Sequence, residues 1–184
     1  MVIKKSKAKQ WFSVIAPKLF NEMELAKTMA VDPESLIDRK IGLSVMELTN
    51  DFSKYYMKIF FRIKKVEGDK AFAEFAGSEC MRDYISRMVL RRARRIDTVQ
   101  DLVTKDGKKI TVKGITISRR IKSNIEKAIR VRMKVLIKSE VENSTLDEFI
   151  KKILTDEMKG LLLRECRRIY PVRNFEVRKT SINV

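Results

Sequence analysis

Arginine is concentrated in one short stretch of the sequence, where residues 91–95 read Arg-Arg-Ala-Arg-Arg. Four guanidinium groups this close repel one another, so the stretch needs an opposing charge. The planar guanidinium can bind phosphate through two parallel hydrogen bonds and can stack on nucleic-acid bases. The stretch is therefore either a binding site for a polyanion or a solvated surface.

The basic character extends along residues 82–134. This segment holds 17 Lys and Arg against five Asp and Glu, a net charge of +12 out of +17 for the whole chain. An isolated charge run is usually a solvated face. Here, basic groups recur around one predicted hairpin and its two flanking helices while acids collect elsewhere, which favours polyanion binding. The predicted RNA-binding residues are Lys4, Lys5, Lys7, Lys9, Arg87, Arg91, Arg92, Arg94, Arg95, Arg119, Arg120, Lys122, Lys127, Arg130 and Lys134.

Aromatic side chains are few in this basic segment, and helical spacing places Tyr84 on an apolar face. A platform of aromatic rings for stacking bases is therefore not predicted. Phosphate recognition on a folded RNA or a duplex is favoured over the recognition of single-stranded bases.

Residues suited to catalysis or metal binding are scarce. Histidine is absent, which removes the commonest general base and the commonest metal ligand. A phosphate loop ending at Gly107-Lys108 would need Gly and Ser or Thr where the chain has Leu102 and Lys109. Asp97 and Asp101 could share a strand face, but acids in a basic protein are usually ion-pair partners. We predict no enzyme activity, no cofactor and no metal site.

The composition places further limits on the protein class. Hydrophobic residues make up 44% of the 184 residues, enough for a buried core. The pI near 10.0 predicts nonspecific attraction to polyanions, although it says nothing about the fold. Cys80 and Cys166 are far apart and predict reduced thiols of a cytoplasmic protein. Neither a signal peptide nor a membrane-spanning segment is expected, because the apolar runs are too short.

The N-terminal part of the chain changes from basic to acidic. Residues 1–10 form a basic arm that we expect to be unstructured unless bound. Trp11 and Phe12 follow, either as a core anchor, which their large apolar area favours, or as a stacking surface. Residues 19–51 carry seven acids against three bases, a net charge of −4. We expect this acidic segment to face away from any bound polyanion.

Two hairpins are predicted among the elements that must position the basic residues. Apolar and polar residues alternate over residues 55–76, around a turn at Glu67-Gly68-Asp69. Two β-branched runs flank Asp106-Gly107, which supplies the positive φ angles of a tight hairpin. Gly114 in the return strand predicts a bulge.

Two helices are predicted to flank the second hairpin. Helical spacing over residues 80–91 would align Arg87, Arg91 and Arg94 as one stripe. A long helix is expected over residues 119–140. Its predicted buried face comprises Ile121, Ile125, Ala128, Ile129 and Leu136.

The C-terminal part is predicted to be mostly helical. Thr145 and Glu148 form a capping box that starts a helix through Leu154. The helical pattern then continues, with a break expected near Gly160. A short strand is expected in the tail after residue 173.

Strands are grouped in the first two thirds of the sequence and helices in the last third, which favours an α+β fold. We expect an N-terminal arm and aromatic anchor over residues 1–18 and a single α+β RNA-binding domain over residues 19–184. Within that domain, residues 40–119 are rich in strands, residues 120–170 are helical, and residues 171–184 form a short tail.

Four stretches of the sequence resemble one family of ribosomal proteins. They are KAKQWFSVIAPKLF, DFSKYYMKIFFRI, RDYISRMVLRRARRIDTVQDLVTKDGKKITVKGITISRR and RRIYPVRNFEVRK. In this order, and over nearly the whole chain, they are similar to the S-three-Ae family of the small ribosomal subunit. The chain ends soon after the last stretch and lacks the C-terminal extension of eukaryotic members, so the archaeal form is expected.

The resemblance implies an antiparallel β-barrel-like core built from hairpins, with flanking and C-terminal helices. It implies a structural constituent of the small subunit in translation, without catalysis, on the platform near the messenger exit and the 3′ end of the small-subunit ribosomal RNA. Implied partners are that RNA and neighbouring ribosomal proteins, with messenger RNA nearby, in the cytoplasm and away from membranes. The basic arm and Arg91–Arg95 match family segments expected to touch ribosomal RNA.

Three alternatives remain open from the residues alone. The first is a free RNA-binding protein, such as a ribosome-assembly or regulatory factor, which would dissociate at moderate salt. The second is an RNA-modifying enzyme, which would need a cofactor loop or a buried pair of acids. The third is binding to an anionic membrane surface. This alternative is less favoured, because the apolar helix faces are needed for the core.

Overall fold

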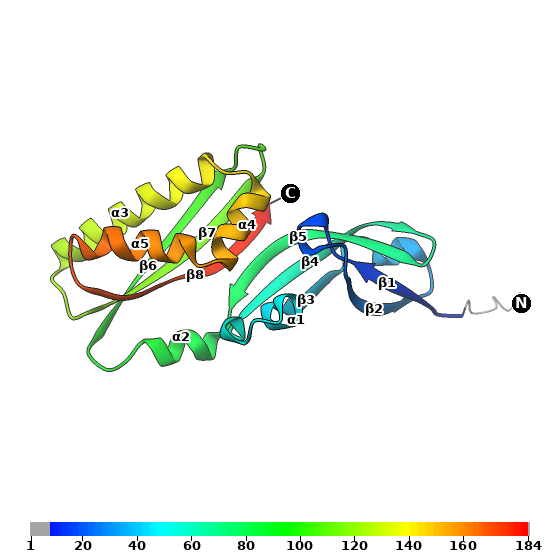
Figure 1. Cartoon of the computed structure of the whole chain (residues 1–184), viewed down its shortest axis with the longest axis horizontal. Coiled ribbons are helices and arrows are strands. Elements are labelled where there is room, and N and C mark those ends of the chain that lie inside the picture. Colours follow the sequence, from blue (N-terminus) through cyan, green and yellow to red (C-terminus); the bar gives the residue numbers. More distant parts are fainter. Residues whose placement is uncertain (1–7, 184) are drawn as a thin grey trace, which may run out of the picture. The chain divides into compact units, whose positions relative to one another are not determined.

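A computed structural model describes residues 8–183 of the chain. These residues contain eight β-strands and five α-helices (Figure 1). The chain divides into two compact units, Met1–Ala76 and Gly77–Val184. The α+β class is confirmed, but within the described residues the strands form an open, mixed sheet and do not close into a barrel. The arm over residues 1–18 and the single domain after it stay predictions.

The first unit is a layer of short and long strands with one short helix. Its elements are β1 (Gln10–Ile15), β2 (Glu24–Ala30), β3 (Lys40–Ser44), α1 (Val45–Thr49), β4 (Met57–Glu67) and the first part of β5 (Lys70–Cys80). β1 pairs antiparallel with β2 and parallel with β5. β4 lies between β3 and β5, so β4 and β5 form the hairpin predicted over residues 55–76.

Strand alternation decides which residues of the first unit are buried. Every second residue of β4, from Met57 to Ile63, is buried, as the pattern predicted. In β1 the same rule buries Phe12 and Val14 and leaves Trp11 60% exposed. The prediction of a core anchor is therefore wrong for Trp11, because neighbouring residues of a strand point to opposite faces.

The second unit is a sheet with helices. Its elements are the end of β5, α2 (Arg82–Met88), β6 (Ala93–Val103), β7 (Lys109–Arg119), α3 (Ser123–Glu142), α4 (Leu146–Leu154), α5 (Glu157–Arg167) and β8 (Val172–Asn183). β7 lies between β6 and β8, and both pairings are antiparallel. Gly77–Glu79 of β5 pair with Lys179–Ser181 on the other side of β8. The expected short tail strand is thus a 12-residue strand with partners on both sides.

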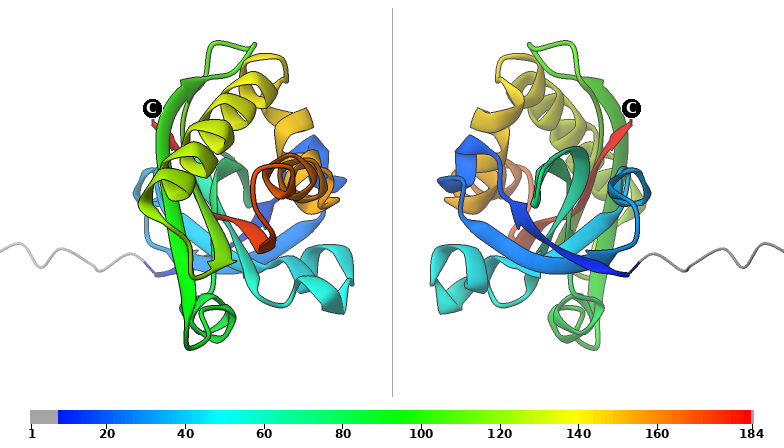
Figure 2. Two further views of the ribbon diagram at one scale, coloured as in Figure 1. Left: turned by 90° about the vertical axis from the view of Figure 1, so that its left-hand side faces the viewer. Right: turned by 90° about the vertical axis from the view of Figure 1, so that its right-hand side faces the viewer.

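Helix α3 packs along one face of the sheet of β6, β7 and β8 (Figures 1 and 2). Its buried stripe is Ile129, Met133, Ile137 and Val141. Of the predicted buried face only Ile129 is fully buried, while Ala128 is exposed and the others are intermediate. The prediction missed Met133, Ile137 and Val141, and it included Ile121, which precedes the start of the helix at Ser123.

The capping box that starts α4 is confirmed. The Glu148 amide donates to the Thr145 hydroxyl at 3.3 Å, and the Thr145 amide donates to the Glu148 carboxylate at 2.9 Å. The break expected near Gly160 is wrong, because α5 runs through that residue. The chain turns instead at Asp156, whose φ of 60° lies in the left-handed region.

Candidate nucleic-acid interface

The five-residue arginine stretch lies at the junction of a helix, a loop and a strand. Helix α2 ends at Met88, and Arg92 adopts a left-handed φ of 66° in the loop that follows. Arg94 and Arg95 belong to β6. The predicted stripe of Arg87, Arg91 and Arg94 is therefore wrong, because the three residues do not share a helix.

Strand pairing brings a second basic group to the same end of the hairpin. Ala93 of β6 pairs with Arg119 of β7, so the segment 91–95 lies beside the segment 119–122. The turn at residues 104–108 is at the opposite end, about 35 Å away along strands of this length. The structure thus separates the basic residues of this region into two groups.

Two guanidinium groups of residues 91–95 form ion pairs within the protein. Arg94 Nε donates to Glu126 at 2.8 Å, and Arg130 donates to the other oxygen of the same carboxylate at 2.8 Å. The hydrogen bond from Arg94 lowers the pKa of Glu126. Arg95 Nε donates to both oxygens of Asp97, at 2.9 and 3.1 Å.

Most of the other predicted residues have no such partner. Within residues 8–183, no ion pair is made by Lys9, Arg87, Arg91, Arg92, Arg119, Arg120, Lys122, Lys127 or Lys134. All of them are exposed, and Lys9 belongs to the first compact unit. Lys4, Lys5 and Lys7 lie outside the described residues. The unpaired charge is therefore densest at the end of the β6–β7 hairpin that carries Arg91 and Arg120.

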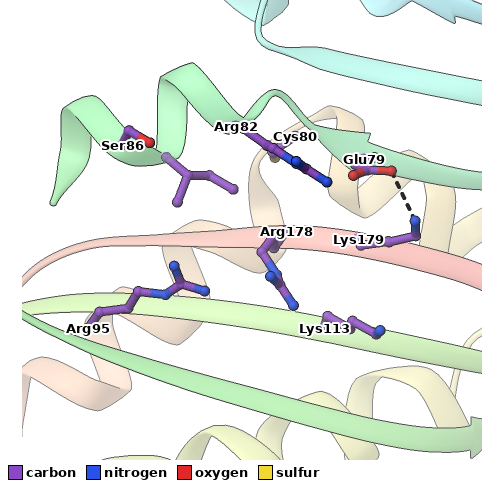
Figure 3. A pocket seen from close by; sticks show the side chains of 9 residues that line it. Glu79, Cys80, Arg82, Ser86, Arg95, Lys113, Arg178 and Lys179 are labelled. Carbon is purple, nitrogen blue, oxygen red and sulfur yellow. Dashed lines mark hydrogen bonds and ion pairs between the residues drawn. The ribbon is translucent and has the colours of Figure 1, made fainter.

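A basic cavity of about 460 Å³ adds residues that the sequence patterns missed (Figure 3). Its charged lining comprises Arg82, Arg95, Lys113, Arg178, Lys179 and Glu79. Of these, only Arg95 was predicted as a binding residue. The others come from α2, β7, β8 and the end of β5, and no spacing along the chain relates them. Arg82 and Lys113 lie in the basic segment 82–134, but the dipeptide Arg178-Lys179 lies outside that segment, in the predicted C-terminal tail.

The described part of the chain has neither an exposed thiol nor a metal-binding cluster. Cys80 and Cys166 are buried and belong to no disulfide, and burial raises the pKa of the Cys166 thiol to about 11. Residues 8–183 contain no group of three or more His, Cys, Asp and Glu side chains that could hold a metal ion. None of the helices in this range is both long and apolar enough to cross a membrane. What the described surface of this region presents to a ligand is mainly positive charge.

Comparison with known proteins identifies the family. The ribosomal S3Ae family matches the chain over residues 1–183. This chain belongs to the ribosomal S3Ae family. The predicted membership is confirmed, and with it the prediction that the protein is a structural component and not an enzyme.

Individual members of the S3Ae family are similar to this chain along almost their whole length. A protein of Methanopyrus kandleri named small ribosomal subunit protein eS1 is 39% identical over 187 residues, which cover 99% of this chain and 89% of that protein. Its namesake from Sulfurisphaera tokodaii is 35% identical over 179 residues, covering 97% and 93%. Another, from Methanothrix thermoacetophila, is 37% identical over 179 residues, covering 97% and 85%.

Proposed function

We propose that this chain is a structural component of the small ribosomal subunit that binds small-subunit ribosomal RNA through its second compact unit. The observation that carries the proposal is the group of unpaired basic side chains at one end of the β6–β7 hairpin. That group comprises Arg91, Arg92, Arg119, Arg120 and Lys122. The names of the archaeal relatives support the assignment to the small subunit.

The physical role is to neutralise and position RNA. Each contact between a Lys or Arg and a phosphate releases counterions from the RNA, which drives association. Arg94 and Arg95 differ from their neighbours because Glu126 and Asp97 hold their guanidinium groups. Groups oriented in this way lose less side-chain entropy on binding than free ones. The stretch therefore combines two adaptable arginines, Arg91 and Arg92, with two oriented ones.

The resemblance of the four sequence stretches supports a finer placement. We propose a position on the platform of the small subunit, near the messenger exit and the 3′ end of the ribosomal RNA, in the cytoplasm. Neighbouring ribosomal proteins are then partners, and messenger RNA passes nearby. The exposed Trp11 of β1 is a candidate stacking surface beside the basic arm.

Sedimentation tests the proposed function against the alternative of a free assembly or regulatory factor. The tagged protein is followed through a sucrose gradient at about 0.5 M monovalent salt, where charges beyond a few ångströms are screened. We expect it to sediment with small subunits and whole ribosomes in stoichiometric amount. Protein that stays at the top, or that sediments only with precursor particles, would instead support the free factor.

A matched pair of variants tests the interface itself. R91Q/R92Q/R120Q removes three charges from one end of the hairpin, and K105Q/K108Q/K109Q removes three from the other end. We expect the first to lower RNA affinity by about 30-fold or more and the second by only a few-fold, because each lost phosphate contact weakens binding. Both should keep their thermal stability, since surface changes rarely exceed about 0.5 kcal/mol.

A further inference from the structure

The basic cavity lies on the sheet face opposite α3. Helix α2 covers one end of this face, where Tyr84 donates to Glu176 at 3.1 Å and Asn174 contacts the Met88 sulfur at 2.9 Å. Arg95 lies on this face as well, because its neighbour Ile96 is buried on the α3 side. Beyond α2 the face opens into the cavity, whose wall is completed by the end of β5 (Figure 3).

A β-bulge places two consecutive basic residues in this cavity. Lys113 pairs with Lys179, but the next residue of β7, Gly114, pairs with Val177, so Arg178 is an extra residue in β8. In a regular strand, consecutive side chains point to opposite faces. The extra residue breaks this alternation and directs Arg178 and Lys179 to the same side. The register shift falls at Gly114, where a bulge in β7 was predicted, but the extra residue belongs to β8, because β7 pairs with β6 without interruption. Its consequence is a second cation in the cavity.

The charges in the cavity are only partly balanced by the protein. Glu79 accepts a hydrogen bond from Lys179 at 3.0 Å, and Asp97 holds Arg95. Among the described residues, Arg82, Lys113 and Arg178 form no ion pair. Lys113 also lies directly opposite Lys179, and like charges in a cross-strand pair are destabilising. The unliganded protein carries this repulsion, and a bound anion would relieve it.

The size and lining of the cavity indicate the class of anion. A volume of about 460 Å³ lies within the range of small-molecule binding pockets and far exceeds the space of one water molecule. No aromatic side chain lines the cavity, so a stacked base is not favoured. Three unpaired cations come from three different elements, α2, β7 and β8, and can contact phosphates from several directions.

We propose that this cavity binds clustered phosphate groups, and that in the ribosome they belong to a sharp turn of the ribosomal RNA backbone. The inference rests on the proposed function and adds a second contact to it, distinct from the end of the β6–β7 hairpin. Lys113 and Arg178 are its central residues, Arg82 closes it from α2, and Glu79 orients Lys179.

The first test measures RNA affinity with matched charge changes. K113Q/R178Q removes two cavity charges, and K105Q/K108Q removes two charges at the far turn of the same unit. Binding to small-subunit ribosomal RNA from the same cells is measured between about 50 and 200 mM KCl. We expect the cavity variant to lose about 10-fold or more in affinity and its salt slope to fall by about two, with a loss of under about 3-fold in the control. Equal losses would overturn the proposal.

The second test measures occupancy without RNA. Inorganic tripolyphosphate, which presents adjacent phosphates, should raise the melting temperature of the wild-type protein and leave that of K113Q/R178Q unchanged. Without anion, the variant should melt at the same or a slightly higher temperature, because the repulsion between Lys113 and Lys179 is gone. A drop of several degrees would show that these side chains stabilise the fold instead, and would overturn the proposal.

The two tests separate the cavity from the proposed function. If the wild-type protein sediments with small subunits but the cavity and control variants bind RNA equally, the cavity proposal fails and the proposed function stands. If tripolyphosphate protects the protein while the wild type binds no ribosomal RNA, the proposed function fails and the cavity serves a free polyphosphate, which overturns RNA as its occupant. R178E provides a second variant, and its loss of RNA affinity should exceed that of R178Q.

Discussion

The two faces of the sheet formed by β6, β7 and β8 are made of alternate residues of the same strands, yet they have opposite characters. The α3 face is apolar and closely packed, and its buried Thr116 hydroxyl contacts the Met133 sulfur at 2.9 Å. The opposite face is covered by α2 at one end only and gathers Lys113, Arg178 and Lys179 around a cavity. At its α2 end the opposite face also buries Ile115 and Ile117, the neighbours of Thr116 in β7. Mutations beneath α3 should therefore change stability, whereas mutations in the cavity should change RNA binding.

The largest expected effect is a truncation on the α3 face. Ile137→Ala removes a fully buried side chain beneath the helix, and we expect a loss of about 3 kcal/mol in the free energy of unfolding. Val135→Ala on the same helix is the control, because Val135 is 53% exposed and should change stability by under about 0.5 kcal/mol. Urea denaturation measures both. Similar losses in the two variants would contradict the assignment of the buried face.

A smaller effect is expected at Gly114 of β7, which is close to Ile137 of α3. A Cβ added at Gly114 would lie 3.0 Å from Thr98 Oγ1 and 3.2 Å from a ring carbon of Phe175, so Gly114→Ala should cost about 1–2 kcal/mol through overpacking. Gly160→Ala is the matched control, since that helical position has no neighbour within 4 Å. It should stabilise the protein by about 0.5–1 kcal/mol. Thermal unfolding of the two variants should therefore shift in opposite directions.

The ionic contacts of α3 should make stability depend on pH in the acid range. Hydrogen bonds from Arg94 and Arg132 lower the pKa values of Glu126 and Glu165, respectively, below the ordinary value of 4.5. A carboxyl group with a lowered folded-state pKa stabilises the fold above its unfolded value, and this contribution is lost as the pH falls through the folded value. We expect E126Q/E165Q to flatten the decline in stability below about pH 4.5 relative to the wild type. Parallel curves would show that these contacts contribute nothing.

The smallest expected effect concerns both RNA affinity and stability. The carboxylate of Glu126 orients Arg94 but also repels RNA phosphate, and Gln keeps an acceptor that can orient Arg94, so Glu126→Gln should raise RNA affinity by about 2-fold to 3-fold. The same change should cost at most about 1 kcal/mol of stability, as expected for a partly exposed ion pair. Filter binding and urea denaturation measure the two effects. A fall in affinity would show instead that Glu126 mainly orients Arg94 for its phosphate contact.

Local patterns predicted the individual elements well. Alternation identified the β4–β5 hairpin, Asp106-Gly107 identified the β6–β7 hairpin, and Thr145 with Glu148 identified the start of α4. Errors occurred where the local signal was missing or continued beyond the end of the element. The turn at Asp156 has no glycine to mark it, and the apolar spacing continued past Met88 although the helix ended there.

The sequence by itself determined that the protein is a basic α+β protein that lacks histidine, because charge, histidine content and residue periodicity are properties of the chain. It also determined which segment carries the positive charge. Only the tertiary structure decided that Arg94 is paired with Glu126 and that Arg91 is not. It alone placed Lys113 opposite Lys179, 66 residues later in the chain, and put Arg178 beside them through a bulge. Strand register is set by long-range pairing and core packing, so no local pattern could have revealed the cavity.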